Sequence, residues 1–200
     1  MEAQNDSRSG CPPVYARRTV LKGTLSLGLA LPWYQVAAAQ ESEPRNMRPQ
    51  AGDRFVFPPG TRAGQLITPD DLPMGGPPVL AYPMDPQTAV VRDGSRLNQV
   101  LLLRLDPAAL AEETRARAAE GIVAFSAVCT HAGCDVTLWQ ADVQRFKCPC
   151  HDSEFDPKEG AHVISGPAPR RLPMLPVQIV DGILSAMSGF TSRPGFQQGS

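Results

Sequence analysis

Two short segments rich in cysteine and histidine constrain this chain more than any other feature. The first is Cys129-Thr130-His131-Ala132-Gly133-Cys134, and the second is Cys148-Pro149-Cys150-His151, with 13 residues between them. Together they contain four cysteines and two histidines, which is more than one tetrahedral metal ion needs. The sequence therefore predicts a fold in which two loops converge, and it leaves open which of these side chains bind metal.

Proline content argues against long helices in the first half of the chain. The sequence has 21 prolines, ten of them between Pro44 and Pro86. A proline inside a helix removes a backbone donor and clashes with the preceding turn. We therefore expect this half to be extended, and short strand candidates lie at residues 55–57, 79–82, 88–91 and 99–105.

The second half of the chain shows how strands could position the two loops. Residues 122–128 form a continuous apolar run, as expected of a strand buried on both faces, and lead directly to Cys129. Residues 136–139 and 143–146 flank a polar turn like a hairpin, which would return the chain to Cys148. Further strand candidates are residues 162–164, and the hairpin 177–180 with 183–187 around Asp181-Gly182.

One helix is expected within this pattern of strands. Asp106 is suited to a helix N-cap, Pro107 to the first helical position and Gly121 to the position just past the end. Its apolar face is thin, so we expect a surface insertion at about 107–120. The predicted fold class is thus all-β, with one inserted helix.

The N-terminal region resembles an export signal. Arg17 and Arg18 precede an apolar stretch from Gly23, and the small residues 37–39 suit a signal peptidase, as in twin-arginine signals. We expect residues 1–39 to be this signal or a short anchor, 40–53 to be a linker and 54–200 to be the globular domain. A periplasmic location follows from this expectation, with membrane attachment only if the N-terminal segment is retained.

The charge balance excludes one class of partner. The formal net charge is -1, and Lys and Arg form no stripe that could neutralise phosphates along a nucleic acid. We therefore expect no nucleic-acid partner.

Two interpretations of the metal site follow from the residues alone. Each loop offers one thiolate and one imidazole, from Cys129 and His131 in the first and from Cys148 and His151 in the second. A single zinc ion could bind all four, since two cysteines and two histidines are a common tetrahedral set. Alternatively, a cluster of two irons and two sulfides could bind the cysteines through one iron and the histidines through the other.

The amino-acid sequences of the motifs favour the second interpretation. CTHAGC and CPCHDSEF are similar to the two signature loops of Rieske iron-sulfur proteins, and GPAPR resembles their third, proline-containing loop. The resemblance covers the chain from about Gly121 to the C-terminus. It implies a Rieske fold of antiparallel sheets with a cluster-binding part at about 122–170, a Rieske 2Fe-2S cofactor, and the four ligands named above.

The resemblance also implies roles for neighbouring residues. In members with a second cysteine in each loop these cysteines form a disulfide, here Cys134 with Cys150. Ser153 matches a serine that donates a hydrogen bond to a bridging sulfide, whereas Phe155 replaces a tyrosine often found in members of higher potential. Residues next to the ligands tune such a centre, and the resemblance places Gly166 and Pro167 of the third loop among them. Ala132 and Asp152 depart from the leucine and glycine of quinol-oxidising members.

The expected function is electron transfer, and the chain is not expected to be catalytic alone. It looks most similar to the small subunit of arsenite oxidase, which implies a larger molybdenum-containing subunit as electron donor and a cytochrome c or small copper protein as acceptor. The alternative is the Rieske subunit of a quinol:cytochrome c oxidoreductase, with a retained anchor. A remote alternative is a structural zinc module of a secreted binding protein.

Overall fold

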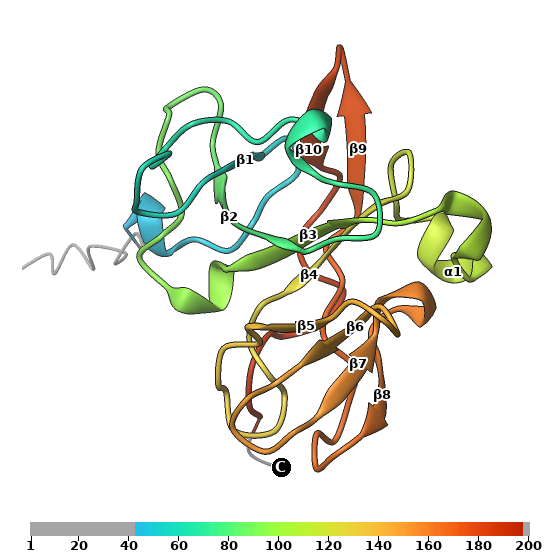
Figure 1. Cartoon of the computed structure of the whole chain (residues 1–200). Helices are drawn as coiled ribbons and strands as arrows, with labels where there is room; N and C mark the ends of the chain where they lie inside the picture. The colour runs from blue at the N-terminus through green and yellow to red at the C-terminus, as the bar shows by residue number, and fades with distance from the viewer. Residues whose placement is uncertain (1–42, 198–200) are drawn as a thin grey trace, which may run out of the picture. The chain divides into compact units, whose positions relative to one another are not determined.

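The computed structural model describes residues 43–197, so the predicted signal and the first residues of the linker lie outside the described residues. Two antiparallel sheets contain all ten strands of this region (Figure 1). Short 3-10 helices accompany them at Pro44–Asn46, Pro69–Asp71, Arg96–Asn98, Pro107–Ala109 and Pro157–Glu159. The predicted all-β class with antiparallel sheets is confirmed.

The larger sheet has six strands and curls until its two edge strands approach each other. Its order is β4 (Ile122–Ser126), β3 (Val100–Arg104), β2 (Val79–Met84), β1 (Arg54–Val56), β10 (Ile183–Ala186) and β9 (Val177–Val180). The segment before β9 bonds back to β4, because the Leu175 N–H donates to the Ala124 carbonyl at 2.9 Å. The inner face encloses one hydrophobic core, which contains Phe55, Leu102 and Leu184.

The smaller sheet packs against the outer face of the larger one, and each of the two cysteine- and histidine-containing segments leads into one of its strands. Its order is β5 (Leu138–Gln140), β6 (Arg145–Lys147), β7 (Glu154–Asp156) and β8 (His162–Ser165). A second hydrophobic core joins the sheets, and in it the rings of Phe125 and Phe146 meet edge to face at 5.9 Å. β4 therefore has both faces buried, which explains its continuous apolar sequence.

The inserted helix is shorter than expected. Residues 107–120 contain the 3-10 turn Pro107–Ala109, capped by the Asp106 side chain, and one α-helical turn, α1 (Glu112–Arg115). Leu110 separates them because its side chain is buried in the core between the sheets, and this requires an extended backbone. None of the helices in residues 43–197 is long and apolar enough to cross a bilayer.

Two strand expectations also differ from the structure. Residues 88–91 do not form a strand. Thr88 ends a turn in which the Asp85 side chain accepts hydrogen bonds from Gln87 and Thr88, and Val91 makes only an isolated β-bridge to Met84. Conversely, β7 follows the second cysteine- and histidine-containing segment directly, although its three residues carry no strand pattern of their own. β7 forms because it pairs with strands on both sides.

A buried ion pair fixes the start of the larger sheet. The Asp53 carboxylate accepts two hydrogen bonds from Arg92, at 2.6 Å and 2.9 Å, and both side chains are at most 5% exposed. Asp53 also accepts from the Gln50 N–H. The pair joins the entry to β1 with the segment that follows β2.

We predict that Asp53→Ala destabilises the protein by about 3–5 kcal/mol, because it leaves the Arg92 guanidinium buried without its partner. Urea unfolding followed by circular dichroism measures this loss. Asp93→Ala is the matched control, since Asp93 pairs with Arg45 at the surface, where ion pairs contribute little. Equal unfolding midpoints for the two variants would contradict the prediction.

Candidate metal centre

The first cysteine- and histidine-containing segment is a closed loop at the end of β4. The Cys129 N–H donates to the carbonyl of Cys134 (2.8 Å), and the Gly133 N–H donates back to the carbonyl of Cys129 (3.0 Å). Gly133 has a φ of +75°, in the left-handed region that glycine adopts without strain. Backbone hydrogen bonds therefore define the conformation of this loop.

The second segment, between β6 and β7, repeats the same hydrogen-bond pattern. The Cys148 N–H donates to the Ser153 carbonyl (2.9 Å), and the Asp152 N–H donates to the Cys148 carbonyl (3.1 Å). Asp152 thus takes the place that Gly133 has in the first loop, with a φ of +58°. Aspartate tolerates this conformation better than most residues. The two loops are equivalent in backbone structure and start from equivalent cysteines.

Cys129 and Cys148 are the free cysteines of the described residues, and both are buried. Burial is the main cause that raises the pKa of the Cys129 thiol, to about 11 in the metal-free protein, and the nearby Cys148 thiol contributes to this rise. The N–H groups of His131 and Ala132 donate to the Cys129 sulfur and oppose this effect. These two N–H groups would stabilise the thiolate once a metal ion replaces the proton.

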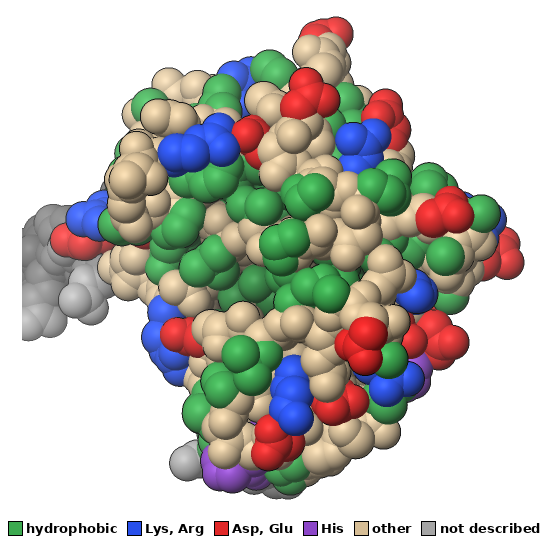
Figure 2. Space-filling view, viewed as in Figure 1, with side chains coloured by type: hydrophobic (Ala, Val, Ile, Leu, Met, Phe, Trp, Pro, Cys, Tyr) green, Lys and Arg blue, Asp and Glu red, His purple; other side chains and the backbone are tan. Residues whose placement is uncertain are grey.

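His131 and His151 lie at the outer side of the loops. Their Nδ1 atoms are 3.2 Å apart and their rings are nearly perpendicular, with centroids 4.6 Å apart. Two nitrogens bound to one tetrahedral metal ion at about 2.1 Å would be about 3.4 Å apart, so this spacing fits two ligands of one ion. Figure 2 shows histidine side chains at the lower end of the molecule, beyond the smaller sheet.

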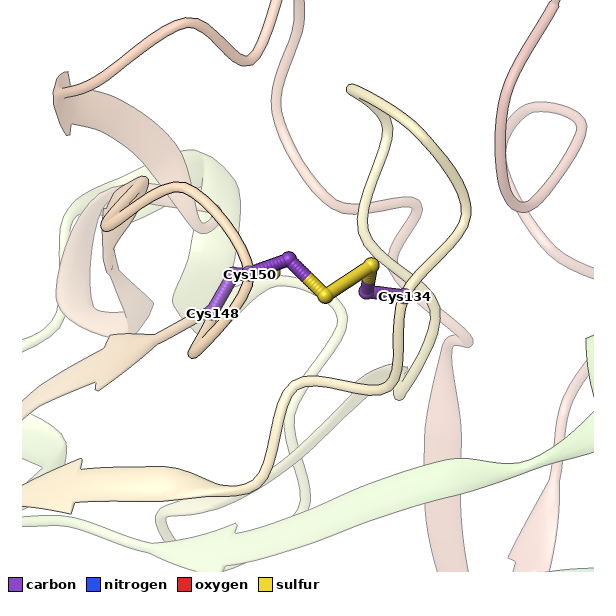
Figure 3. A group of neighbouring side chains, drawn as sticks. All are labelled: Cys134, Cys148 and Cys150. Carbon is purple, nitrogen blue, oxygen red and sulfur yellow. A yellow bond between two sulfur atoms is a disulfide. The ribbon is translucent and has the colours of Figure 1, made fainter.

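A disulfide between Cys134 and Cys150 joins the two loops. The Cys148 residue lies beside it (Figure 3), and the sulfur atoms of the three cysteines are all within 4.8 Å of one another. Only Cys148 can supply a thiolate from this group, because disulfide sulfurs carry no negative charge. The four available donors are therefore two buried thiols and two imidazoles near the surface, a set that suits a cluster with sulfur ligands inside and nitrogen ligands outside.

The segment Gly166 to Arg170 packs on both loops. The Ser153 hydroxyl accepts a hydrogen bond from the Ala168 N–H (3.1 Å), so its own proton remains available for a sulfur acceptor. Thr130, which is fully buried, donates to the Arg170 carbonyl (2.5 Å). A Cβ atom at Gly166 would lie 2.5 Å from the Ser153 Cα, so only glycine fits there.

The remaining predicted residues differ in their exposure. Phe155 is fully buried in the core between the sheets, and Pro167 is exposed beside Gly166. The Asp152 carboxylate is exposed and pairs with the Lys147 ammonium at 2.9 Å. A negative charge next to His151 is thus partly neutralised by a neighbouring lysine.

Sequence reasoning missed Arg96, a residue that supports the site. Arg96 binds the Asp135 carboxylate at 2.6 Å and donates to the Gly133 carbonyl, so it holds the first loop from outside. Trp139 packs on Phe146 and covers Gly76, where a Cβ would lie 2.8 Å from the indole ring. No local pattern identifies Arg96, because its partners are 37 and 39 residues away.

Comparison with known families explains this arrangement. The family model described as the Rieske [2Fe-2S] domain matches residues 66–176, more than half of the chain. The chain belongs to the Rieske family. The cofactor of this Rieske protein is therefore a 2Fe-2S cluster, and the zinc module is not supported.

Curated relatives carry the name cytochrome bc1 complex Rieske iron-sulfur subunit. Those from Streptomyces lividans and Streptomyces coelicolor are each 39% identical to this Rieske protein over 98 residues, or 48% of this chain. The match covers 58% of the Streptomyces lividans protein and 28% of the Streptomyces coelicolor protein. The relative from Mycobacterium tuberculosis is 38% identical over 104 residues, 49% of this chain and 24% of its own. The chain thus matches less than two thirds of the length of these relatives.

Solved structures with similarity include two Rieske proteins. The plasma membrane Rieske protein PetC3 from Synechocystis is 26% identical, with a TM-score of 0.35 over 54% of this chain and 84% of its own. The soluble domain of Rieske protein II from Sulfolobus acidocaldarius is 21% identical, with a TM-score of 0.38 over 74% of this chain and 72% of its own.

We predict that replacing both Cys134 and Cys150 by alanine lowers the free energy of unfolding by about 3 kcal/mol, since the disulfide closes a loop across 16 residues. Guanidinium unfolding of the cluster-loaded protein, followed by cluster absorbance, measures the loss. Wild-type protein with its disulfide reduced should match the double variant. Unchanged unfolding in both samples would show that the bond does not support the site.

Proposed function

We propose that this Rieske protein carries electrons as a subunit of a quinol:cytochrome c oxidoreductase. The observation that carries this proposal is the identity of 38–39% to relatives named as cytochrome bc1 Rieske subunits. The disulfide that joins the two loops agrees with this proposal. The resemblance described above implies the same bond in Rieske proteins with a second cysteine in each loop. Its partners would then be the quinol-binding and cytochrome subunits of the complex.

Four residues are proposed to hold the cluster: Cys129 and Cys148 on one iron, and His131 and His151 on the other. When bound, a Rieske cluster accepts and releases one electron at a potential of about -150 to +300 mV. The buried thiols keep the sulfur ligands away from water. The imidazoles lie at the surface and would face the redox partners.

The expected roles of the neighbouring residues carry over to this proposal. The Ser153 hydroxyl is free to donate to a sulfide, because the hydrogen bond from Ala168 uses only its lone pair. Phe155 cannot donate a hydrogen bond to a cysteine sulfur. Gly166 and Pro167 would lie beside the centre as part of the third loop.

The domain limits and the location are also proposals. Residues 1–39 would direct export by the twin-arginine route or remain as an anchor. Residues 40–53 would be a linker between this segment and the Rieske domain. The Rieske domain itself would be residues 54–200, with its cluster-binding part at about 122–170. The family match at 66–176 lies inside this domain. The disulfide supports export, since such bonds persist in oxidising compartments such as the periplasm.

A second candidate is an electron-transfer subunit similar to the small subunit of arsenite oxidase. Ala132, Asp152 and Phe155 favour it, because they depart from the quinol-oxidising pattern. The partners would then be a molybdenum-containing subunit and a cytochrome c or small copper protein. Purification of the tagged full chain with its native partners separates the two candidates: haem-containing subunits without molybdenum support the first, and copurified molybdenum would move the assignment to the second.

We predict a reduction potential below about +300 mV, because Phe155 provides no hydrogen bond to a sulfur ligand. Phe155→Tyr should raise it by roughly 40 mV, the equivalent of about 1 kcal/mol for one hydrogen bond. Voltammetry of the loaded protein measures both values. Phe57→Tyr is the control, because Phe57 is partly buried against the core of the larger sheet, and it should leave the potential unchanged. A wild-type value above this limit would contradict the prediction.

A further inference from the structure

A groove on the protein surface is formed by two segments that are far from the four site cysteines in sequence. It has a volume of about 530 Å³ and lies between residues 48–50 and 189–194. Pro49 and Pro194 are both buried and give it a rigid lining, and Phe190 adds an apolar surface. The groove therefore exists without rearrangement of the backbone.

The charges in this groove are not balanced by the protein. Arg48 and Arg193 both line it, and no acidic residue does. Among residues 43–197 neither arginine forms an ion pair; Arg48 donates only to the neutral Asn98 side chain, at 3.2 Å. The nearby Asp53 carboxylate is engaged by Arg92. Two guanidinium groups thus share one groove without a counterion.

This arrangement is unfavourable in the absence of an anion. Loss of hydration, and then the positive charge of Arg193, lower the pKa of Arg48. By contrast, the guanidinium groups of Arg45 and Arg92 are each paired with a carboxylate, which raises their pKa. A bound anion in the groove would remove the repulsion between Arg48 and Arg193.

We propose that this groove binds a phosphate group, with Arg48 and Arg193 as its two cationic partners. A phosphate with a charge near -2 matches two guanidinium groups in charge, and its oxygens match their planar pairs of donors. Ser192 also lines the groove and offers a hydroxyl donor. Free phosphate supplies this charge, whereas the phosphodiester of a phospholipid headgroup supplies the same oxygen acceptors with a charge of about -1. This site does not depend on the proposed electron-transfer function.

Binding of inorganic phosphate to the full chain, loaded with its cluster, tests this site by titration calorimetry. We expect saturable binding, weakened about tenfold or more by Arg48→Gln and by Arg193→Gln, since each removes a charge-assisted contact. Arg115→Gln is the matched control, because Arg115 is exposed, outside the groove, and bonded to the Leu110 carbonyl. Circular dichroism and cluster absorbance establish that each variant is folded.

Vesicle sedimentation distinguishes the two sources of phosphate. If phosphatidylglycerol vesicles bind the wild type more than the Arg48→Gln, Arg193→Gln double variant, the ligand is a lipid headgroup. If the vesicles bind both proteins equally and only inorganic phosphate binds the wild type more tightly, the ligand is free phosphate. Either result supports the site. Absence of binding to both inorganic phosphate and the vesicles, equal binding by all variants, or binding of a glutamate peptide that phosphate does not displace would overturn the proposal.

Discussion

The disulfide between Cys134 and Cys150 is the constraint on which the arrangement of this site depends. Each loop by itself presents one thiol and one imidazole, which is half of a ligand set. Backbone hydrogen bonds shape each loop separately, but they do not join the two loops. The disulfide makes this connection next to the buried Cys148 sulfur. A preformed arrangement lowers the entropy lost when a metal centre is bound.

The two sheets supply the remaining support. β4 leads into the first loop while its Phe125 packs on Phe146 of β6, the strand that leads into the second loop. The starting points of both loops are therefore fixed by one hydrophobic core. Thiols at the base of the loops are dry, and imidazoles at their ends are close to water. Replacing anionic thiolates by neutral imidazoles reduces the negative charge of a cluster, so an added electron meets less repulsion.

Much of this arrangement could be predicted from the sequence because its signals are local. The apolar run before Cys129 and the polar turns between paired strands indicated the sheets, and the spacing of cysteines and histidines indicated the site. The interrupted helix could not be predicted, since burial of Leu110 depends on tertiary packing. The contact of Arg96 with the first loop also depends on residues distant in sequence. The same holds for the groove in which Arg48 and Arg193 lie together.

The central claim is that two cysteines and two histidines of this chain share a cluster of two irons and two sulfides. Pulsed electron-nuclear double resonance on the reduced protein, labelled with ¹⁵N only at histidine, tests it most directly. We expect couplings from two histidine nitrogens, in protein that contains iron and acid-labile sulfide in equal amounts. A reduced iron-sulfur signal without histidine coupling, or one metal ion per chain without sulfide, would contradict it.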